Sequence, residues 1–113
     1  QRQMCIRDRN MTYDELYQIL EPTGIPFEIH HWEQPPAPPY GVYFDDYTDN
    51  FGADDRVYCQ ITHFCVELYQ LRRDRALEQK IEDALDAADL FWDRVVEYID
   101  SERLYQTRYE IEV

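Results

Sequence analysis

The run RVYCQITHFCVELYQL, residues 56–71, is the longest strand-like segment of the chain. Its apolar residues alternate on odd positions from 57 to 61 and on even positions from 64 to 68. Strict alternation is typical of a half-buried strand. The change of parity near Thr62 and His63 indicates a bulge or a bend, which lets a long strand curl. We therefore expect one long, bent strand here.

Four shorter segments favour further strands. Residues 27–33, 41–47, 91–99 and 104–113 are rich in aromatic and β-branched side chains, and most of them alternate in polarity. The polar segment 48–55, which ends in GADD, is typical of a turn. We expect this turn to reverse the chain just before the long strand.

Proline punctuates the chain between the first two of these strands. Four of the six prolines lie in the segment QPPAPPY, residues 34–40. Proline has no backbone N–H to donate to a strand ladder, so this segment cannot itself be a paired strand. We expect a rigid, polyproline-like connector that sets the angle between the two strands.

Two segments carry helix-start signals. Thr12 and Glu15 form a capping box, and Pro22 with Gly24 should end the first helix. Asp74 is a candidate N-cap for a second helix with an apolar stripe, formed by Leu77, Ile81, Ala84, Leu85 and Ala88. The element order α-β-β-β-α-β-β predicts an α+β fold, with an antiparallel sheet of about five strands and both helices packed on one face.

Length and charge restrict the possible functions. The 113 residues suit one domain. A formal net charge of -13 argues against binding to nucleic-acid phosphates or to anionic membranes, because both need clustered basic residues. No apolar run approaches the roughly 20 residues that a membrane helix needs.

Residues 1–10 differ from the rest of the chain. They show neither helical nor strand periodicity, and they hold three of the eleven basic residues. Met11 then opens the segment with the first helix-start signal. We expect residues 1–10 to be a non-native or disordered extension, and residues 11–113 to form the single domain.

We expect no catalytic, cofactor or metal site. No nucleophile–base arrangement is visible, and His30 and His31 are neighbours, so on a strand they would point to opposite faces. We expect these two histidines and His63 on the surface or in turns. The acidic segment 45–55 suggests a calcium loop, but Phe51 stands where such a loop needs its glycine.

The three cysteines, Cys5, Cys59 and Cys65, agree with a reducing compartment. On one extended strand Cys59 and Cys65 would lie about 20 Å apart, at ~3.3 Å per residue, which is too far for a disulfide. An odd number without a CxxC spacing leaves neither a disulfide framework nor a zinc site. We expect buried or half-buried thiols.

Several short motifs together resemble one family. They are GIP at 24–26, PPYGVY at 38–43, DNFGAD at 49–54, VY at 57–58, VELY at 66–69, YIDSERLYQ at 98–106 and YEIEV at 109–113. With these motifs the chain is similar to the tail-terminator, or tail-completion, proteins of long-tailed phages and prophages of Gram-positive bacteria. The similarity extends over residues 11–113 and contains no catalytic signature.

The resemblance implies a structural protein of the virion, located at the head–tail junction and assembled in the cytoplasm of the bacterial host. Such a subunit forms a ring, expected to be a homohexamer, on the head-proximal end of the tail tube. The ring stops tube polymerisation and joins the tail to the head. Its partners would be itself, the tail tube protein and the head–tail connector protein, while DNA passes through without specific binding.

Under this resemblance two sets of residues become candidates. The first set would contact neighbouring subunits or partners, and comprises Pro35, Pro36, Pro38, Pro39 and Tyr40 in the proline segment, with Tyr47, Phe51 and Asp54 in the polar turn. The second set would line a lumen that repels DNA, and comprises the acidic residues of the second helix and its end, Glu78, Glu82, Asp83, Asp86 and Asp89. An ordinary solvated helix face is the alternative for the second set.

Two other functions stay open. An acidic protein could mimic DNA and inhibit a host DNA-binding protein, but that role does not require alternating, tyrosine-rich strands. The neighbouring head–tail adaptor would share the ring symmetry but contact the connector. Binding to purified tail tube rather than to a host DNA-binding protein would separate the first alternative from the terminator.

Overall fold

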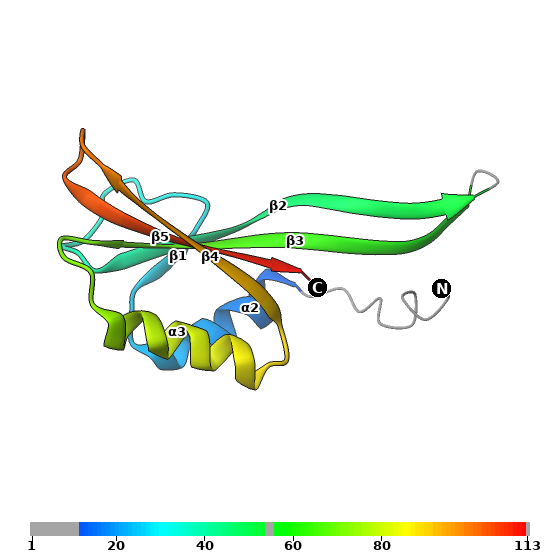
Figure 1. The fold of residues 1–113 in the computed structure, drawn as a ribbon, viewed down its shortest axis with the longest axis horizontal. Coiled ribbons are helices and arrows are strands. Elements are labelled where there is room, and N and C mark those ends of the chain that lie inside the picture. The colour runs from blue at the N-terminus through cyan, green and yellow to red at the C-terminus, as the bar shows by residue number, and fades with distance from the viewer. Residues whose placement is uncertain (1–11, 54–55, 113) are drawn as a thin grey trace.

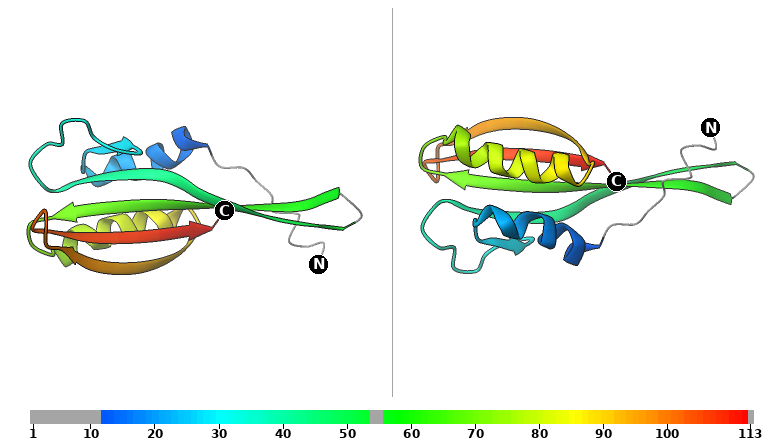
Figure 2. Two further views of the ribbon diagram at one scale, coloured as in Figure 1. Left: turned by 90° about the horizontal axis from the view of Figure 1, so that it is seen from above. Right: turned by 90° about the horizontal axis from the view of Figure 1, so that it is seen from below.

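The computed structural model describes residues 12–53 and 56–112, which form one sheet covered by one layer of helices (Figure 1). In chain order the elements are α2 (Tyr13–Leu20), the 3-10 turn η1 (Glu21–Thr23), β1 (Phe27–Ile29), β2 (Tyr40–Ala53), β3 (Arg56–Gln70), α3 (Arg75–Ala87), β4 (Phe91–Ile99) and β5 (Leu104–Glu112). The strand order in the sheet is β1-β2-β3-β5-β4. Both helices lie on the same face (Figure 2), which confirms the predicted α+β architecture.

The helices begin where the sequence predicts. The side chain of Thr12 accepts from the Glu15 N–H, and the Glu15 carboxylate accepts from the Thr12 N–H, so the capping box is complete. Asp74 accepts from the N–H groups of Ala76 and Leu77 at the start of α3. These bonds satisfy backbone donors that the first turn of a helix leaves without partners.

The sheet is not wholly antiparallel, because β1 pairs with β2 in parallel, with Phe27 opposite Gly41. The proline segment carries the chain back past the whole of β1 before β2 begins, so the two strands run in the same direction. Strand β1 is also shorter than the predicted 27–33. It ends at Ile29, because His30 adopts a positive φ of 67° that no strand continues.

The core lies between the helices and the sheet. Leu16 and Leu20 of α2, and Ile81 and Leu85 of α3, are fully buried. They belong to one cluster with side chains from four strands: Phe27, Tyr43, Phe64, Val66, Leu68, Tyr109 and Ile111. The even positions of β3 from 64 to 68 therefore form the helix-facing part of the long strand. Burial of this size is the main favourable contribution to folding.

The hairpin of β2 and β3 is longer than predicted. Segment 48–55 is not a turn over its whole length, because β2 continues to Ala53, which pairs with Arg56. Strand β1 borders β2 only at 41–43, and β5 borders β3 only from His63 onward. Within the described part of the chain, residues 48–53 and 56–62 have no strand neighbours besides each other, and we call them, together with Tyr47 at their base, the arm (Figure 1).

The arm begins at an irregularity in the ladder. Asp45 pairs with Phe64 and Tyr47 pairs with His63, so Asp46 is an extra residue on β2. This shift lies opposite the place where the alternation of β3 changes parity, which confirms the predicted bulge and assigns its extra residue to the partner strand. A β-bulge of this kind bends a strand and changes the direction of the residues beyond it.

Replacing Leu85 with Ala should lower the free energy of unfolding by about 2–5 kcal/mol, because a fully buried side chain is lost and a cavity remains. Leu71 is 63% exposed, so Leu71→Ala should change it by less than about 0.5 kcal/mol. Chemical denaturation of the two variants measures the difference. Equal losses would contradict the packing of α3 against the sheet.

Candidate assembly interface

The arm is a two-stranded ribbon that projects beyond the body of the sheet (Figures 1 and 2). A ribbon of this kind is only marginally stable by itself in water. Along its outer edges, backbone N–H and C=O groups make no hydrogen bonds to a third strand among the described residues. Both properties favour docking against another surface.

Sequence and register together give the arm two different faces. Positions 47, 49 and 51 of β2 stand opposite positions 63, 61 and 59 of β3, and these positions share one face of the ladder. The residues there are mostly apolar: Tyr47, Phe51, Cys59 and Ile61, with Asp49 and His63. The alternate positions of this stretch are polar: Thr48, Asn50, Gln60 and Thr62. A second register shift follows Phe51, so this pattern describes the part of the arm between the two shifts. The arm is therefore amphipathic in sequence.

Two of the predicted contact residues of the polar turn, Tyr47 and Phe51, thus belong to the strand part of the arm. Asp54 lies outside the described residues. The base of the arm is fixed to α2 by Tyr13, whose hydroxyl donates to the Asp45 carboxylate and accepts from the Asp45 N–H at 3.0 Å. This clasp holds the direction in which the arm leaves the sheet.

The proline segment lies at the opposite end of the molecule from the arm (Figure 1). Pro35, Pro36 and Pro39 are exposed, and Pro38 and Tyr40 are half-buried. The predicted contact residues therefore form two separate surfaces and are not brought together.

The segment before β2 is tied to the sheet by aromatic side chains. The Trp32 ring donates through Nε1 to the Gly41 carbonyl oxygen at 2.8 Å and meets Tyr40 edge to face. Tyr40 in turn stacks on Tyr69 of β3, with ring centroids 5.3 Å apart. A rigid connector is the prediction that these contacts support.

Strand β4 forms an open edge of the sheet, because among the described strands it pairs only with β5. Phe91 is 67% exposed and Val95 is 46% exposed, and Tyr98 is also exposed. Exposed apolar side chains along an unpaired strand edge promote association with other chains unless a partner covers them. The alternation of β4 was visible in the sequence but this surface was not, because alternation alone does not show which face lacks a covering helix.

Only part of the predicted acidic set lies on the surface of the molecule. Glu78 is fully buried and Glu82 is nearly so, and both side chains turn toward the sheet. Asp83, Asp86 and Asp89 are exposed. The second set of candidates therefore divides into a buried pair and an exposed group of three, and the buried pair cannot line a lumen.

Arginines neutralise the buried pair. Glu78 accepts from Arg73 at 2.8 Å and from Arg75 at 2.5 Å. Glu82 accepts from Arg94 of β4 at 2.6 Å, and Arg75 also reaches it at 3.3 Å. Buried carboxylates persist in proteins when they are paired and hydrogen-bonded in this way.

Two sheet residues complete the network from the other side. The Thr107 hydroxyl donates to Glu78 at 3.0 Å, and the Tyr109 hydroxyl donates to Glu82 at 2.9 Å. Burial, and then the hydrogen bond to Glu82, raise the pKa of Tyr109, so its hydroxyl stays a donor. The network therefore joins α3 to β4 and β5.

The hydrogen bonds also set the protonation of the two carboxyls. Burial by itself raises the pKa of Glu78, but the donors Arg73, Arg75 and Thr107 outweigh it, and the net pKa is lowered. Burial likewise raises the pKa of Glu82, and hydrogen bonds from Arg75, Tyr109 and Arg94 reverse the effect. Both groups therefore stay ionised in the folded chain at neutral pH.

The three exposed acids lie on the outer side of α3 or just beyond its end. Asp83 accepts from Gln79 at 2.9 Å, and Asp86 accepts from the Trp92 ring at 2.9 Å. Asp89 follows the helix with a positive φ of 60°. These three positions are what remains of the predicted acidic face.

Histidine and cysteine positions are mixed in outcome. His30 and His31 are exposed, as predicted, but His63 is buried where the arm meets the body of the sheet, so its placement on the surface is wrong. Cys65 is buried, as predicted. No group of three or more His, Cys, Asp or Glu residues is arranged to hold a metal ion within residues 12–53 and 56–112.

Comparison with known proteins adds no family, because no family model matches the chain and no curated protein matches it significantly. None of the helices among the described residues is long and apolar enough to cross a membrane.

Replacing Glu78 with Gln should lower the free energy of unfolding at pH 7 by on the order of 2–3 kcal/mol, because the charge-assisted bonds from the arginines are weakened. Asp83→Asn, on the exposed side of the same helix, should change it by less than about 0.5 kcal/mol. Urea denaturation of the two variants measures the contrast. A loss of equal size at Asp83 would contradict the burial of the pair.

The effect of Glu78→Gln should also depend on pH. The folded pKa of Glu78 lies below its ordinary value of 4.5, so its stabilisation is complete above that value and is lost as the pH falls through the folded pKa. The gap between the unmodified chain and the variant should therefore narrow below about pH 4.5. A gap that widens in acid would show that the sign is wrong.

Proposed function

We propose that this chain is a structural subunit and that copies of it assemble into a ring through contacts between unlike surfaces. The ring caps the head-proximal end of a phage tail tube. In this role it stops tube polymerisation and joins the tail to the head connector. The shape of the subunit supports the self-assembly, and the motif resemblance supports the place in the virion.

The amphipathic arm is the observation that carries the self-assembly. It projects from one end of the molecule, while the proline segment lies at the other end (Figure 1). A contact between the arm of one subunit and a different surface of the next is heterologous, and it produces a ring when the rotation between subunits closes. An arm that reaches a neighbour also hides its apolar positions and its unpaired backbone groups.

The open edge of β4 is the surface that suits the arm best. It offers unpaired backbone groups to a further strand and the exposed side chains of Phe91 and Val95 to an apolar face. Strand addition at an open edge supplies affinity through main-chain hydrogen bonds, and side-chain contacts supply specificity. The edge lies beside β5, away from the strands that form the arm.

The charge of the subunit is compatible with a DNA passage. A net charge of -13 disfavours phosphate binding, and Asp83, Asp86 and Asp89 remain available to a lumen on the helix face. The same charge would serve a DNA mimic, but that function leaves the arm without a purpose and cannot use the buried carboxylates of Glu78 and Glu82.

Shortening the arm should abolish assembly but not folding. Residues 49–61 can be replaced by Asn-Gly, because Thr48 pairs with Thr62 and this dipeptide favours a two-residue hairpin turn. In polymerisation reactions of the purified tail tube protein, the full chain should limit tube length, and the shortened chain should leave tubes overlong in negative-stain images. Circular dichroism should show similar melting for both.

A matched pair of substitutions tests the same surface with less disturbance. Phe51→Ser removes an apolar position of the arm, whereas Asn50→Ser changes the neighbouring polar position. Only the first should raise the tube length and reduce the ring seen by sedimentation velocity. Normal capping by the shortened chain or by Phe51→Ser would refute the role of the arm, and binding to purified connector but not to tubes would indicate the head–tail adaptor.

A further inference from the structure

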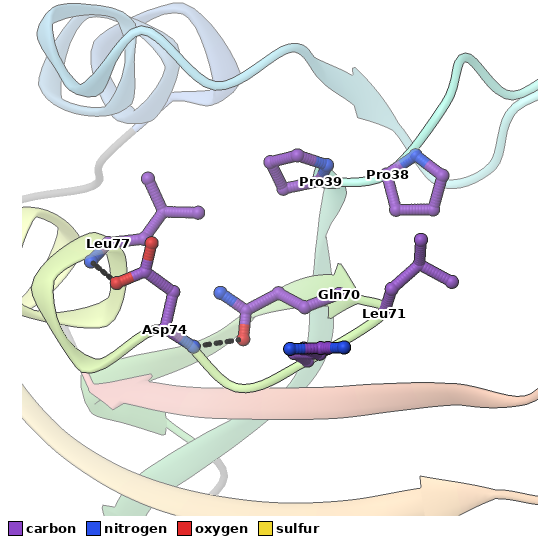
Figure 3. A pocket seen from close by; sticks show the side chains of 7 residues that line it. Pro38, Pro39, Gln70, Leu71, Asp74 and Leu77 are labelled. Carbon is purple, nitrogen blue, oxygen red and sulfur yellow. Dashed lines mark hydrogen bonds between the residues drawn. The ribbon is translucent and has the colours of Figure 1, made fainter.

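A pocket of about 300 Å³ lies between the proline segment and the start of α3 (Figure 3). It is separate from the arm and from the edge of β4. The residues that line it are Pro38, Pro39, Gln70, Leu71, Arg72, Asp74 and Leu77. Its volume is at the lower end of the roughly 300–1,000 Å³ that small-molecule pockets occupy, which suits one or two residues of a peptide.

Gln70 gives this pocket a side-chain N–H donor that requires an acceptor. The residue is only 2% exposed, and its Oε1 accepts from the Asp74 N–H at 3.2 Å. That bond fixes the orientation of the amide, because only the oxygen can accept. Nε2 is therefore the other branch of the amide, and in Figure 3 it lies beside the space between Pro39 and Leu77.

The Nε2 group of Gln70 is buried and has no hydrogen-bond partner among the residues that the structure describes. Leaving a buried donor without an acceptor is costly, and such groups are uncommon in folded proteins. A ligand that brings an oxygen to this position would remove the cost. The pocket therefore favours a ligand with an acceptor at its inner end.

The remaining lining residues describe the rest of the ligand. Leu71, Leu77 and the two prolines provide apolar walls. Arg72 has further N–H donors, and Asp74 uses Oδ1 for the helix N–H groups, so its other carboxylate oxygen can accept an N–H. Donors and an acceptor around an apolar hollow are complementary to a peptide unit that carries an apolar side chain.

We propose that this pocket binds an extended peptide segment of a partner protein by one apolar side chain of about the size of leucine. The Gln70 amide donates through Nε2 to a main-chain carbonyl oxygen of that segment, and the apolar side chain lies against Leu71, Leu77 and the prolines. This site is independent of the ring, because it uses neither the arm nor β4.

N-acetyl-L-leucine N-methylamide is the simplest probe, because it carries two peptide units and one leucine side chain. Added to the full chain labelled with ¹⁵N, it should shift the side-chain amide signals of Gln70 saturably, with a dissociation constant on the order of 1 mM, as expected for so small a ligand. The glycine analogue of the probe should bind at least about tenfold more weakly, since it lacks the apolar group.

Two variants identify the contacts. Gln70→Glu keeps an acceptor for the Asp74 N–H but replaces the donor with a second oxygen, so the shifts should be lost. Leu71→Ser, at an exposed wall position, should weaken binding several-fold without affecting the fold, and it keeps the test decisive if Gln70→Glu does not fold.

Three results would overturn the proposal. The first is an absence of shifts at Gln70 up to the solubility limit of the probe. The second is equal shifts with the glycine analogue, and the third is unchanged binding in Leu71→Ser. N-acetyl-L-leucine, which ends in a carboxylate, serves as a further arm of the experiment. Binding tighter than the neutral probe by tenfold or more would contradict the neutral peptide as ligand.

Discussion

The difference in strand length is the constraint on which the rest of the structure depends. Strands β2 and β3 have 14 and 15 residues, whereas β4 and β5 have 9 each and β1 has 3. The far part of the β2–β3 hairpin extends past the ends of the neighbouring strands, so it projects beyond the body of the sheet. The bulge at Asp46 marks this point, and the clasp between Tyr13 and Asp45 fixes it. The arm thus projects because β2 and β3 are longer than the strands that flank them.

The elements that local chemistry determines were predictable from the sequence. Thr12, Glu15 and Asp74 cap their helices as expected, and β4 has the predicted bounds. The pairing of strands that are distant in sequence was harder to predict. The polar residues at 48–53 are typical of a turn, but a two-stranded ribbon in solvent accepts them equally well. The direction of β1 depends on how far the proline segment carries the chain back, which no local pattern records.

The candidate site was predictable only in part, and the acidic helix shows why. A row of carboxylates on a helix has the same appearance in sequence whether it faces solvent or arginines. Glu78 and Glu82 are buried because Arg73, Arg75 and Arg94 come from a loop, a helix start and a strand to meet them. The net charge therefore overstates the negative surface of α3. On α3 and at its end, the charge available to partners lies on Asp83, Asp86 and Asp89.

Site-specific photo-crosslinking from the arm tests the proposed assembly most directly. A benzophenone amino acid at position 51, irradiated in the assembled particle and mapped by mass spectrometry, reports which residues lie next to the arm. Assembly through the arm should give crosslinks between copies of the chain, at residues of β4 such as Phe91 and Val95. Crosslinks confined to the same copy, or to another protein with none between copies, would contradict head-to-tail assembly through the arm.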